Sequence, residues 1–297
     1  NFHLRWNLNN SIRRWQEKFR IDQSPDETEI WLQSLKESCS PPLTASRTLG
    51  ALGGVIASRI AKEFRFGGPS FSVSAEETSG LRALEIGVRS LQQKETDAVL
   101  IGAIDLVGDI RSIITKNQVT PFSKKNKIRP FDPSADGTLP GEGAAALVLK
   151  PLEQAKTDGD RIYAVIRGIG KASGGGINKK PLSPNAYILS LKRAFEDSDV
   201  PPSSIGYIET HGSGNPMEDR MESAAVSRFF GDLTDGTTSP CAVGSIKPNI
   251  GHTGAASGMA AVVKTSLCLY QEIIPPLKND AEPANDSWNK QRFYVPH

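Results

Sequence analysis

The stretch Gly68-Pro-Ser-Phe-Ser-Val-Ser-Ala-Glu-Glu-Thr-Ser-Gly-Leu-Arg-Ala-Leu-Glu85 decides the fold of this chain. The segment Phe71–Val73 is short and apolar, which predicts a strand, and the small residues after it predict a tight turn. Apolar residues then recur at helical spacing, at Leu81, Leu84, Val88 and Leu91. The sequence therefore predicts a strand that turns abruptly into a helix.

The turn of this elbow stands at the N-terminus of the predicted helix. The unpaired N–H groups and the dipole of a helix stabilise negative charge at that end. Many enzymes that form covalent intermediates place a nucleophile at such an elbow. This chain has Glu76-Glu77 there, which offers no thiol or hydroxyl to acylate. We therefore expect no acylated side chain at the elbow.

The composition is that of an ordinary globular chain. Its 297 residues are 38% hydrophobic and 23% charged, which suffices for one large core or two smaller ones. The net charge of +2 is too small to predict binding to nucleic acid or to a membrane surface. We expect no membrane span and no secretory signal. Cys39, Cys241 and Cys268 are scattered and odd in number, which disfavours a disulfide framework and favours a reducing cytoplasm.

The chain divides by pattern into a short N-terminal segment and a larger domain. A helical segment is expected at residues 1–43, because helix-like stretches occur at 12–19 and 27–35. Asp26 could cap the second of them. Residues 44–297 predict the main domain. Its first part, 44–60, is rich in Gly, Ala and Ser, which favours a helix packed closely on another backbone over a loop beside a ligand.

Strands alternate with helices along the main domain, which predicts an α/β layered fold. Strands are expected at 97–104, 144–150, 206–209 and 242–244, and helices at 185–195, 218–230 and 255–269. The first two strands are continuously apolar, which predicts burial on both faces. Residues 121–136 predict a long ordered loop. A strand–turn–helix unit occurs twice, at 71–91 and 242–269, which indicates two duplicated halves.

Two of the four histidines lie in glycine-rich turns that follow apolar strands. His211 lies in Tyr207-Ile-Glu-Thr-His-Gly-Ser-Gly-Asn215, and His252 ends Gly244-Ser-Ile-Lys-Pro-Asn-Ile-Gly-His252. A lone histidine is more often structural, but two in such turns favour an active site. Neutral imidazoles could donate hydrogen bonds to a developing enolate or oxyanion, oriented by Lys247. Zinc is a poor alternative, because neither histidine stands in a cluster with ligand spacing.

These segments, from about Thr44 to Pro276, resemble the β-ketoacyl synthase (ketosynthase) family of fatty-acid and polyketide synthases. The motifs that carry the resemblance are Gly68-Pro-Ser with its elbow, Arg129-Pro-Phe-Asp132, Gly141-Glu-Gly143, and the two histidine turns. The resemblance implies the thiolase-like α/β fold, a five-layer αβαβα arrangement of two duplicated halves. The closing glycine-rich strand of the family is not recognisable in residues 277–297.

The resemblance also implies roles for individual residues. His211 and His252 would hold the carbonyl of a malonyl thioester and favour its decarboxylation. Lys247 would pair with Glu222 as a support. The nucleophilic cysteine of the family aligns with Glu77.

The resemblance further implies partners. Ser213 and Asn215 fall where the family contacts the phosphopantetheine arm of an acyl carrier protein, and Asn215 departs from the hydroxyl expected there. No tightly bound cofactor is implied, and no metal. In the family, the region that corresponds to 97–104 lies at a two-fold dimer interface.

Three functions remain open. The first is a non-acylating domain, akin to a chain-length factor, that pairs with an active ketosynthase as a homo- or heterodimer. The second is a decarboxylase of malonyl thioesters, as in loading domains whose cysteine is replaced by glutamine. The third is a condensing acyltransferase with an unidentified nucleophile. An ionised Glu77 would repel the malonyl carboxylate, which favours the first; the retained His211, Lys247 and His252 favour the second.

Overall fold

The computed structural model describes residues 2–40, 44–107, 109–174, 183–231, 239–277, 288 and 292–296. The chain forms two compact units, Asn1–Ser72 and Val73–His297. The domain boundary expected at residues 43 and 44 falls within the first unit, and it stays a prediction.

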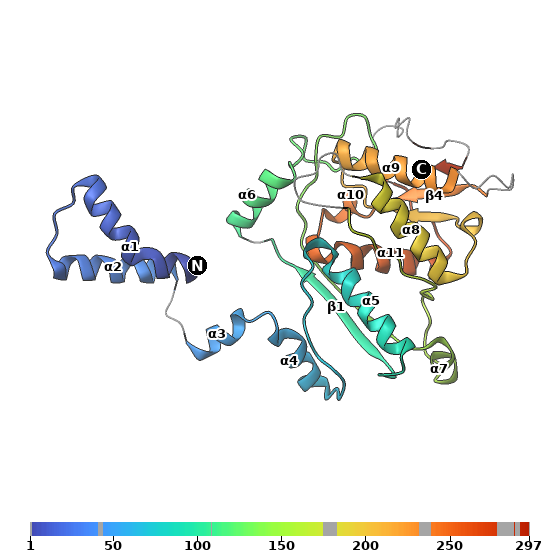
Figure 1. The fold of residues 1–297 in the computed structure, drawn as a ribbon, viewed down its shortest axis with the longest axis horizontal. Helices are drawn as coiled ribbons and strands as arrows, with labels where there is room; N and C mark the ends of the chain where they lie inside the picture. The colour runs from blue at the N-terminus through green and yellow to red at the C-terminus, as the bar shows by residue number, and fades with distance from the viewer. Residues whose placement is uncertain are drawn as a thin grey trace. The chain divides into compact units, whose positions relative to one another are not determined.

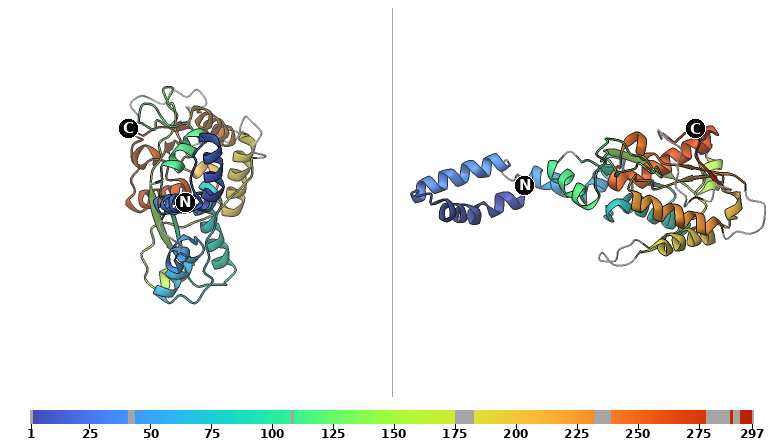
Figure 2. Two further views of the ribbon diagram at one scale, coloured as in Figure 1. Left: turned by 90° about the vertical axis from the view of Figure 1, so that its left-hand side faces the viewer. Right: turned by 90° about the horizontal axis from the view of Figure 1, so that it is seen from above.

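The first unit begins with a pair of helices, α1 (Phe2–Phe19) and α2 (Pro25–Cys39), which lie side by side (Figure 2). Leu8, Ile12 and Leu32 form the buried contact between them. Both helices were expected, but the cap of α2 was not. Ser24, rather than Asp26, accepts a hydrogen bond from the Glu27 N–H, and Glu27 bonds back to the Ser24 N–H. This reciprocal capping box satisfies two N–H groups, whereas a single capping side chain satisfies one.

Two short helices follow, α3 (Ala45–Ala51) and α4 (Val55–Phe64). Among the described residues, the close backbone packing predicted for this glycine-rich region is not found. A Cβ atom added at Gly50, Gly53 or Gly54 would meet nothing within 4 Å. Glycine at these positions is therefore not required by a neighbouring backbone.

The elbow region has the predicted turn and helix, but not the strand. Residues 69–75 are irregular, and the 3-10 turn η1 (Glu76–Thr78) then leads into α5 (Ser79–Gln92). A β-strand needs a neighbour to accept and donate its backbone hydrogen bonds. In the described part of the chain no strand pairs with 71–73, so its apolar alternation does not produce a strand here.

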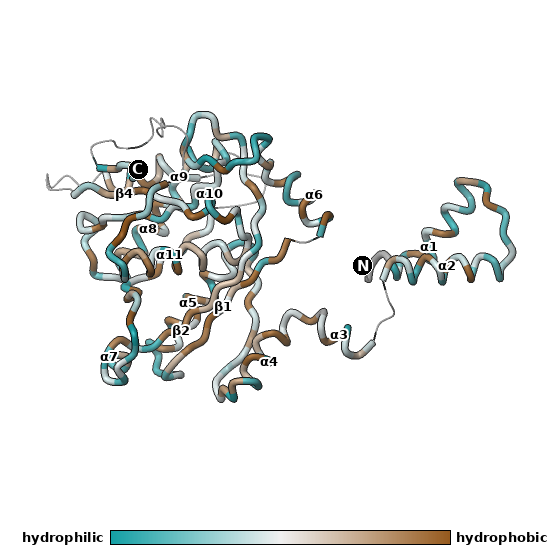
Figure 3. Tube along the Cα trace, turned by 180° about the vertical axis from the view of Figure 1, so that it is seen from behind, coloured by the Kyte–Doolittle hydropathy of each residue, from teal (hydrophilic) through white to brown (hydrophobic). Residues whose placement is uncertain are grey.

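The first sheet consists of β1 (Val99–Asp105) and β2 (Gly143–Leu149), paired antiparallel so that Val99 lies opposite Leu149. One face packs on α5 and α11 (Ser257–Gln271), where Ile101 contacts Leu84 and Met259. Hydrophobic residues run along these strands and α11 (Figure 3).

Within the described part of the second unit the opposite face of this sheet is open, so the burial predicted for both faces is not found there. Leu100, Ile104 and Val148 point outward, and Val148 is 71% exposed. In the chain, β1 is followed by α6 (Ile110–Val119) and by an irregular segment that contains the loop predicted at 121–136. The helix α7 (Leu152–Thr157) follows β2.

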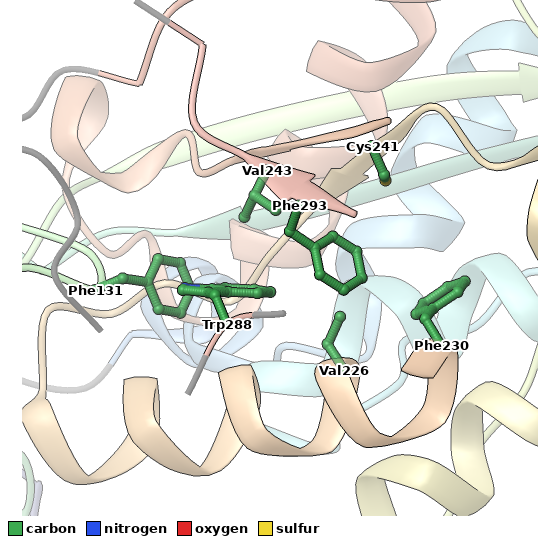
Figure 4. Packing of buried hydrophobic residues seen from close by; sticks show 7 residues of the cluster. All are labelled: Phe131, Val226, Phe230, Cys241, Val243, Trp288 and Phe293. Carbon is green, nitrogen blue, oxygen red and sulfur yellow. The ribbon is translucent and has the colours of Figure 1, made fainter. Parts of the chain in front are cut away.

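The second sheet contains three parallel strands in the order β3 (Tyr207–Glu209), β4 (Cys241–Gly244) and β5 (Phe293–Tyr294). Two contacting helices, α8 (Pro184–Ser198) and α9 (Pro216–Gly231), lie beside it (Figure 1). Val226 and Phe230 project from α9 into an aromatic core that also contains Phe131, Cys241, Val243, Trp288 and Phe293 (Figure 4). A short 3-10 turn, η2 (Pro202–Ser204), precedes β3.

The two halves of the second unit meet at a repeated turn-and-helix. The 3-10 turn η3 (Gly254–Ala256) leads into α11 as η1 leads into α5, and each helix begins with Ser-Gly. A Cβ atom on Gly80 would lie 2.6 Å from Met259 Cγ, and one on Gly258 would clash with Leu81. The residue after each glycine therefore packs against the other glycine: Met259 against Gly80, and Leu81 against Gly258. This reciprocity supports the predicted duplication.

Candidate active site

Two histidine turns converge at one end of the second sheet. His211 follows β3, and His252 follows the short helix α10 (Lys247–Ile250). Their ring centroids are 5.5 Å apart and the rings are inclined by 74°. The structure thus brings together two imidazoles that are separated by forty-one positions in the sequence, as a shared site requires.

A buried clamp fixes the backbone of His211. Glu222 Oε1 accepts a hydrogen bond from the His211 N–H at 2.7 Å, and Lys247 Nζ donates to the His211 carbonyl at 2.5 Å. The pairing expected between Lys247 and Glu222 takes an indirect form in the structure. No ion pair within 4.0 Å joins them among the described residues, because the His211 peptide lies between the two groups.

Burial sets the electrostatics of this clamp. Both Glu222 and Lys247 are buried. Desolvation lowers the pKa of Lys247, and the charges of Glu222 and Glu209 oppose that shift. Tyr187 OH donates to Glu222 at 2.6 Å. The carboxylate therefore has partners for its charge although it lies away from solvent.

The proton of His252 is directed at the elbow. Its Nδ1 accepts a hydrogen bond from the Gly254 N–H at 3.2 Å, so a neutral ring carries its proton on Nε2. Burial, reinforced by the charges of Lys247 and His211, lowers the pKa of His252 to about 3, which keeps the ring neutral at ordinary pH. Its Nε2 lies 3.5 Å from Glu77 Oε2. Glu77 therefore faces one of the two hydrogen-bond donors of the site.

His211 faces a second carboxylate, which sequence reasoning missed. Lys247 Nζ lies 3.5 Å from His211 Nδ1, and His211 Nε2 lies 3.4 Å from Glu218 Oε2. Glu218 stands in the first turn of α9. A glutamate at that position reads as an ordinary residue of a helix start. The available signal was its place seven residues after His211, within the same turn-and-helix motif.

The two residues expected to contact a phosphopantetheine arm make contacts within the protein. Ser213 is fully buried, and its hydroxyl donates to Glu218 at 2.6 Å. Asn215 Oδ1 accepts from the Met217 N–H at 3.0 Å, at the start of α9. Their role toward such an arm stays a prediction.

The buried side chain of Asp219 connects the loop at 121–136 to the turn that contains His211. Asp219 accepts hydrogen bonds from the N–H groups of Phe131, at 2.9 Å, and Gly214, at 3.3 Å. Burial raises the pKa of Asp219 to about 7. Phe131 holds a left-handed φ of 60°, which is costly for a bulky residue. The anchored loop therefore maintains a strained backbone beside the site.

An apolar cavity of about 400 Å³ lies between β2 and α11. It is walled by small and aliphatic residues together with Lys264 and Cys268, and neither histidine lines it. Among the described residues no group of three or more His, Cys, Asp or Glu side chains could hold a metal ion. In the same part of the chain no helix has the length and apolar character that crossing a bilayer requires.

Comparisons with known proteins agree with this geometry. Residues 23–155 match the family described as "Beta-ketoacyl synthase, N-terminal domain", and residues 163–280 match "Beta-ketoacyl synthase, C-terminal domain". The chain belongs to the β-ketoacyl synthase family. Both expected half-units of the fold are thereby accounted for.

Individual relatives place the ketosynthase-family chain beside polyketide synthases. It is 35% identical over 242 residues to polyketide synthase PksL of Bacillus subtilis, covering 81% of this chain and 5% of that protein. It is similar to the ketosynthase from module 6 of the bacillaene synthase of Bacillus subtilis, with 32% identity and a TM-score of 0.75 over 81% of this chain and 43% of that one.

A second solved ketosynthase gives the same result. Ketosynthase twelve of the bacillaene polyketide synthase of Bacillus amyloliquefaciens is 30% identical, with a TM-score of 0.76 over 87% of this chain and 47% of that one. The fold is therefore the thiolase-like α/β fold predicted from the sequence. The chain spans less than half the length of either solved ketosynthase.

Proposed function

We propose that this ketosynthase domain belongs to a polyketide or fatty-acid synthase system and is not itself acylated. It would act as a chain-length-factor-like partner of an active β-ketoacyl synthase. The observation that carries this proposal is the position of Glu77, whose carboxylate lies 3.5 Å from His252 Nε2 at the elbow. A carboxylate there cannot form the thioester that a cysteine would form.

The cysteines of the second unit do not replace the missing nucleophile. Cys241 is buried in the aromatic core, and burial raises its pKa to about 11. Burial also raises the pKa of Cys268, which lines the cavity beside α11. Both are therefore protonated thiols at neutral pH, whereas acyl transfer needs a thiolate.

The open face of the first sheet suits the partner role. Leu100 and Ile104 point outward from β1, and an apolar face of this kind fits an interface with another ketosynthase domain. Ile101 points into the unit and is buried, and its neighbour Val99 packs against the same cluster. A charge at Val99 or Ile101 would therefore test folding, so an association test belongs at Leu100 or Ile104.

Decarboxylation of malonyl thioesters is the second candidate. It is favoured by one observation, namely that the two imidazoles and Lys247 are held in a defined arrangement. Two Nε2–H donors could stabilise the enolate that forms when a malonyl thioester loses carbon dioxide. In either case the thioester would reach the site on the phosphopantetheine arm of an acyl carrier protein.

Mass spectrometry of the intact protein tests the proposal. After incubation with acetyl and malonyl carrier protein, the wild type should show no acyl adduct, while Glu77→Cys should gain one on the peptide 71–82. An adduct on that peptide in the wild type would refute a non-acylating role.

Carbon dioxide release separates the two candidate functions. Wild-type protein should release little from malonyl carrier protein, and Glu77→Gln should release more, because the repelling anion is removed while a carbonyl remains. His252→Ala should abolish whatever release occurs. Strong release by the wild type that falls in Glu77→Gln would favour the decarboxylase.

A further inference from the structure

Glu218 lies beside His211 in the candidate site, and the proposed function assigns it no role. Its Oε2 lies 3.4 Å from His211 Nε2 and accepts a hydrogen bond from Ser213 Oγ at 2.6 Å. The side chain is 27% exposed, so it is held within the turn but reached by solvent. It stands toward His211 as Glu77 stands toward His252, at 3.5 Å. Each imidazole Nε2 therefore faces its own carboxylate.

The charge of Glu218 persists at neutral pH. Burial alone would raise its pKa, but the hydrogen bonds from His211 and Ser213 outweigh burial, and the pKa is lowered. Two cations act on this part of the site: Lys247 is buried and directed at the His211 backbone, and Lys116, whose charge also reaches His252, lies 3.5 Å from Asp105. An anion that enters between the imidazoles therefore meets two carboxylates, whereas both lysines already have partners within the protein.

We propose that Glu218 is a specificity-determining residue which, together with Glu77, makes this site accept neutral acyl thioesters and refuse anionic malonyl thioesters. A neutral thioester carbonyl can compete for the imidazole N–H groups, because the contacts it displaces are long, at 3.4 and 3.5 Å. A malonyl group brings a second carboxylate and is repelled by both glutamates. The inference rests on the proposed function only in taking thioesters as the ligands.

Calorimetric titration with S-acetyl and S-malonyl pantetheine tests this selectivity. We expect the wild type to bind the acetyl thioester at least about tenfold more tightly at low salt, and the ratio to shrink as salt screens the charges. Glu218→Gln keeps a hydrogen-bond acceptor for Ser213 and should reduce the ratio severalfold, mainly by strengthening malonyl binding. Glu218→Asp keeps the charge and should retain a preference for acetyl.

The controls separate local charge from a general effect. Glu153→Gln, on the exposed surface of α7, should leave the ratio unchanged, and circular dichroism should show that all variants are folded. Equal affinities in the wild type, an unchanged ratio in Glu218→Gln, or failure to bind either thioester would each overturn the inference. An acyl adduct at the elbow would instead refute the non-acylating role and leave the measured ratio intact.

Discussion

The two elbows of the second unit share a backbone and differ in what they carry. Glu76 and Gly254 open them with left-handed φ values of 51° and 45°, and a 3-10 turn and a Ser-Gly helix start follow in both. Glu77 reaches solvent from the first elbow and is 60% exposed. In the second elbow, the equivalent residue, Ala255, is half-buried, and Ala256 after it is buried.

This difference separates a packing role from a site role. Asp105, at the end of β1, accepts a hydrogen bond from the Ala255 N–H at 2.8 Å and lies against Gly254, where no Cβ would fit. The second elbow is thus enclosed by its neighbours. The first elbow has no such requirement at Glu76, and it presents charged side chains. The same backbone conformation therefore packs inside the protein in one half and lines the candidate site in the other.

Substitutions at the first residue of each elbow should have the most different effects on the free energy of unfolding. Gly254→Ala should lower the free energy of unfolding by about 3 kcal/mol, because the new Cβ combines a left-handed φ with a clash at Asp105. Glu76→Gly should change it by less than about 1 kcal/mol and in the stabilising direction, because glycine relieves the strain. Urea denaturation measures both, and equal effects would show that the elbows are packed alike.

Acidification should act on the second elbow through His252, two residues before Gly254. Its pKa is about 3 in the folded protein against 6.5 as the ordinary value. Below pH 6.5 the unfolded chain binds a proton there that the folded protein does not, so stability is lost as the pH falls. Between pH 6.5 and 4.5 this loss should be about 2–3 kcal/mol.

The measurement compares the wild type with His252→Asn, whose side-chain oxygen can still accept from Gly254. The stability difference between the two proteins should shrink by that amount on acidification. Asp219 acts in the opposite direction in both proteins, since its raised pKa favours the folded state at lower pH, and it cancels in the difference. A pH-independent difference would show that folding does not lower the pKa of His252.

The smallest effect concerns the glycines that follow the elbows. Gly80→Ala should cost about 1–2 kcal/mol, because its Cβ would lie 2.9 Å from the backbone oxygen of Ala255, which cannot move alone. For Gly258→Ala, the three atoms nearest to the new Cβ all belong to the side chain of Leu81, which is partly exposed and can turn away. This substitution should be nearly neutral. Thermal unfolding of both variants gives the order, and the reverse order would contradict the reciprocal packing.

Sequence periodicity predicted the elements whose partners lie within the chain. The helices α8, α9 and α11 and the strands β1 to β4 lie where apolar spacing placed them. The strand expected at 71–73 failed because its hydrogen bonds need a neighbour that a local pattern cannot supply. The close packing predicted at the glycines at 50, 53 and 54 is not found among the described residues, because glycine content does not reveal what lies above a helix.

The site was predictable in its parts but not in its charges. Glycine-rich turns identified His211 and His252, and the distance between their rings follows from the fold. Glu218 escaped notice because its effect arises from facing His211 across a turn. The hydroxyl of Ser213 bonds to Glu218 within the protein, an orientation that residue type does not determine, and its role toward a ligand stays a prediction.

The clamp on His211 has a consequence for the order of folding. Its Glu222 half closes a loop of eleven residues and can form as soon as β3 and α9 come together. Its Lys247 half spans thirty-six residues and must wait until β4 has joined the sheet. Long-range closure is slower than local closure because more chain entropy is lost first. The imidazole of His211 should therefore reach its final orientation late, after the core beneath it has formed.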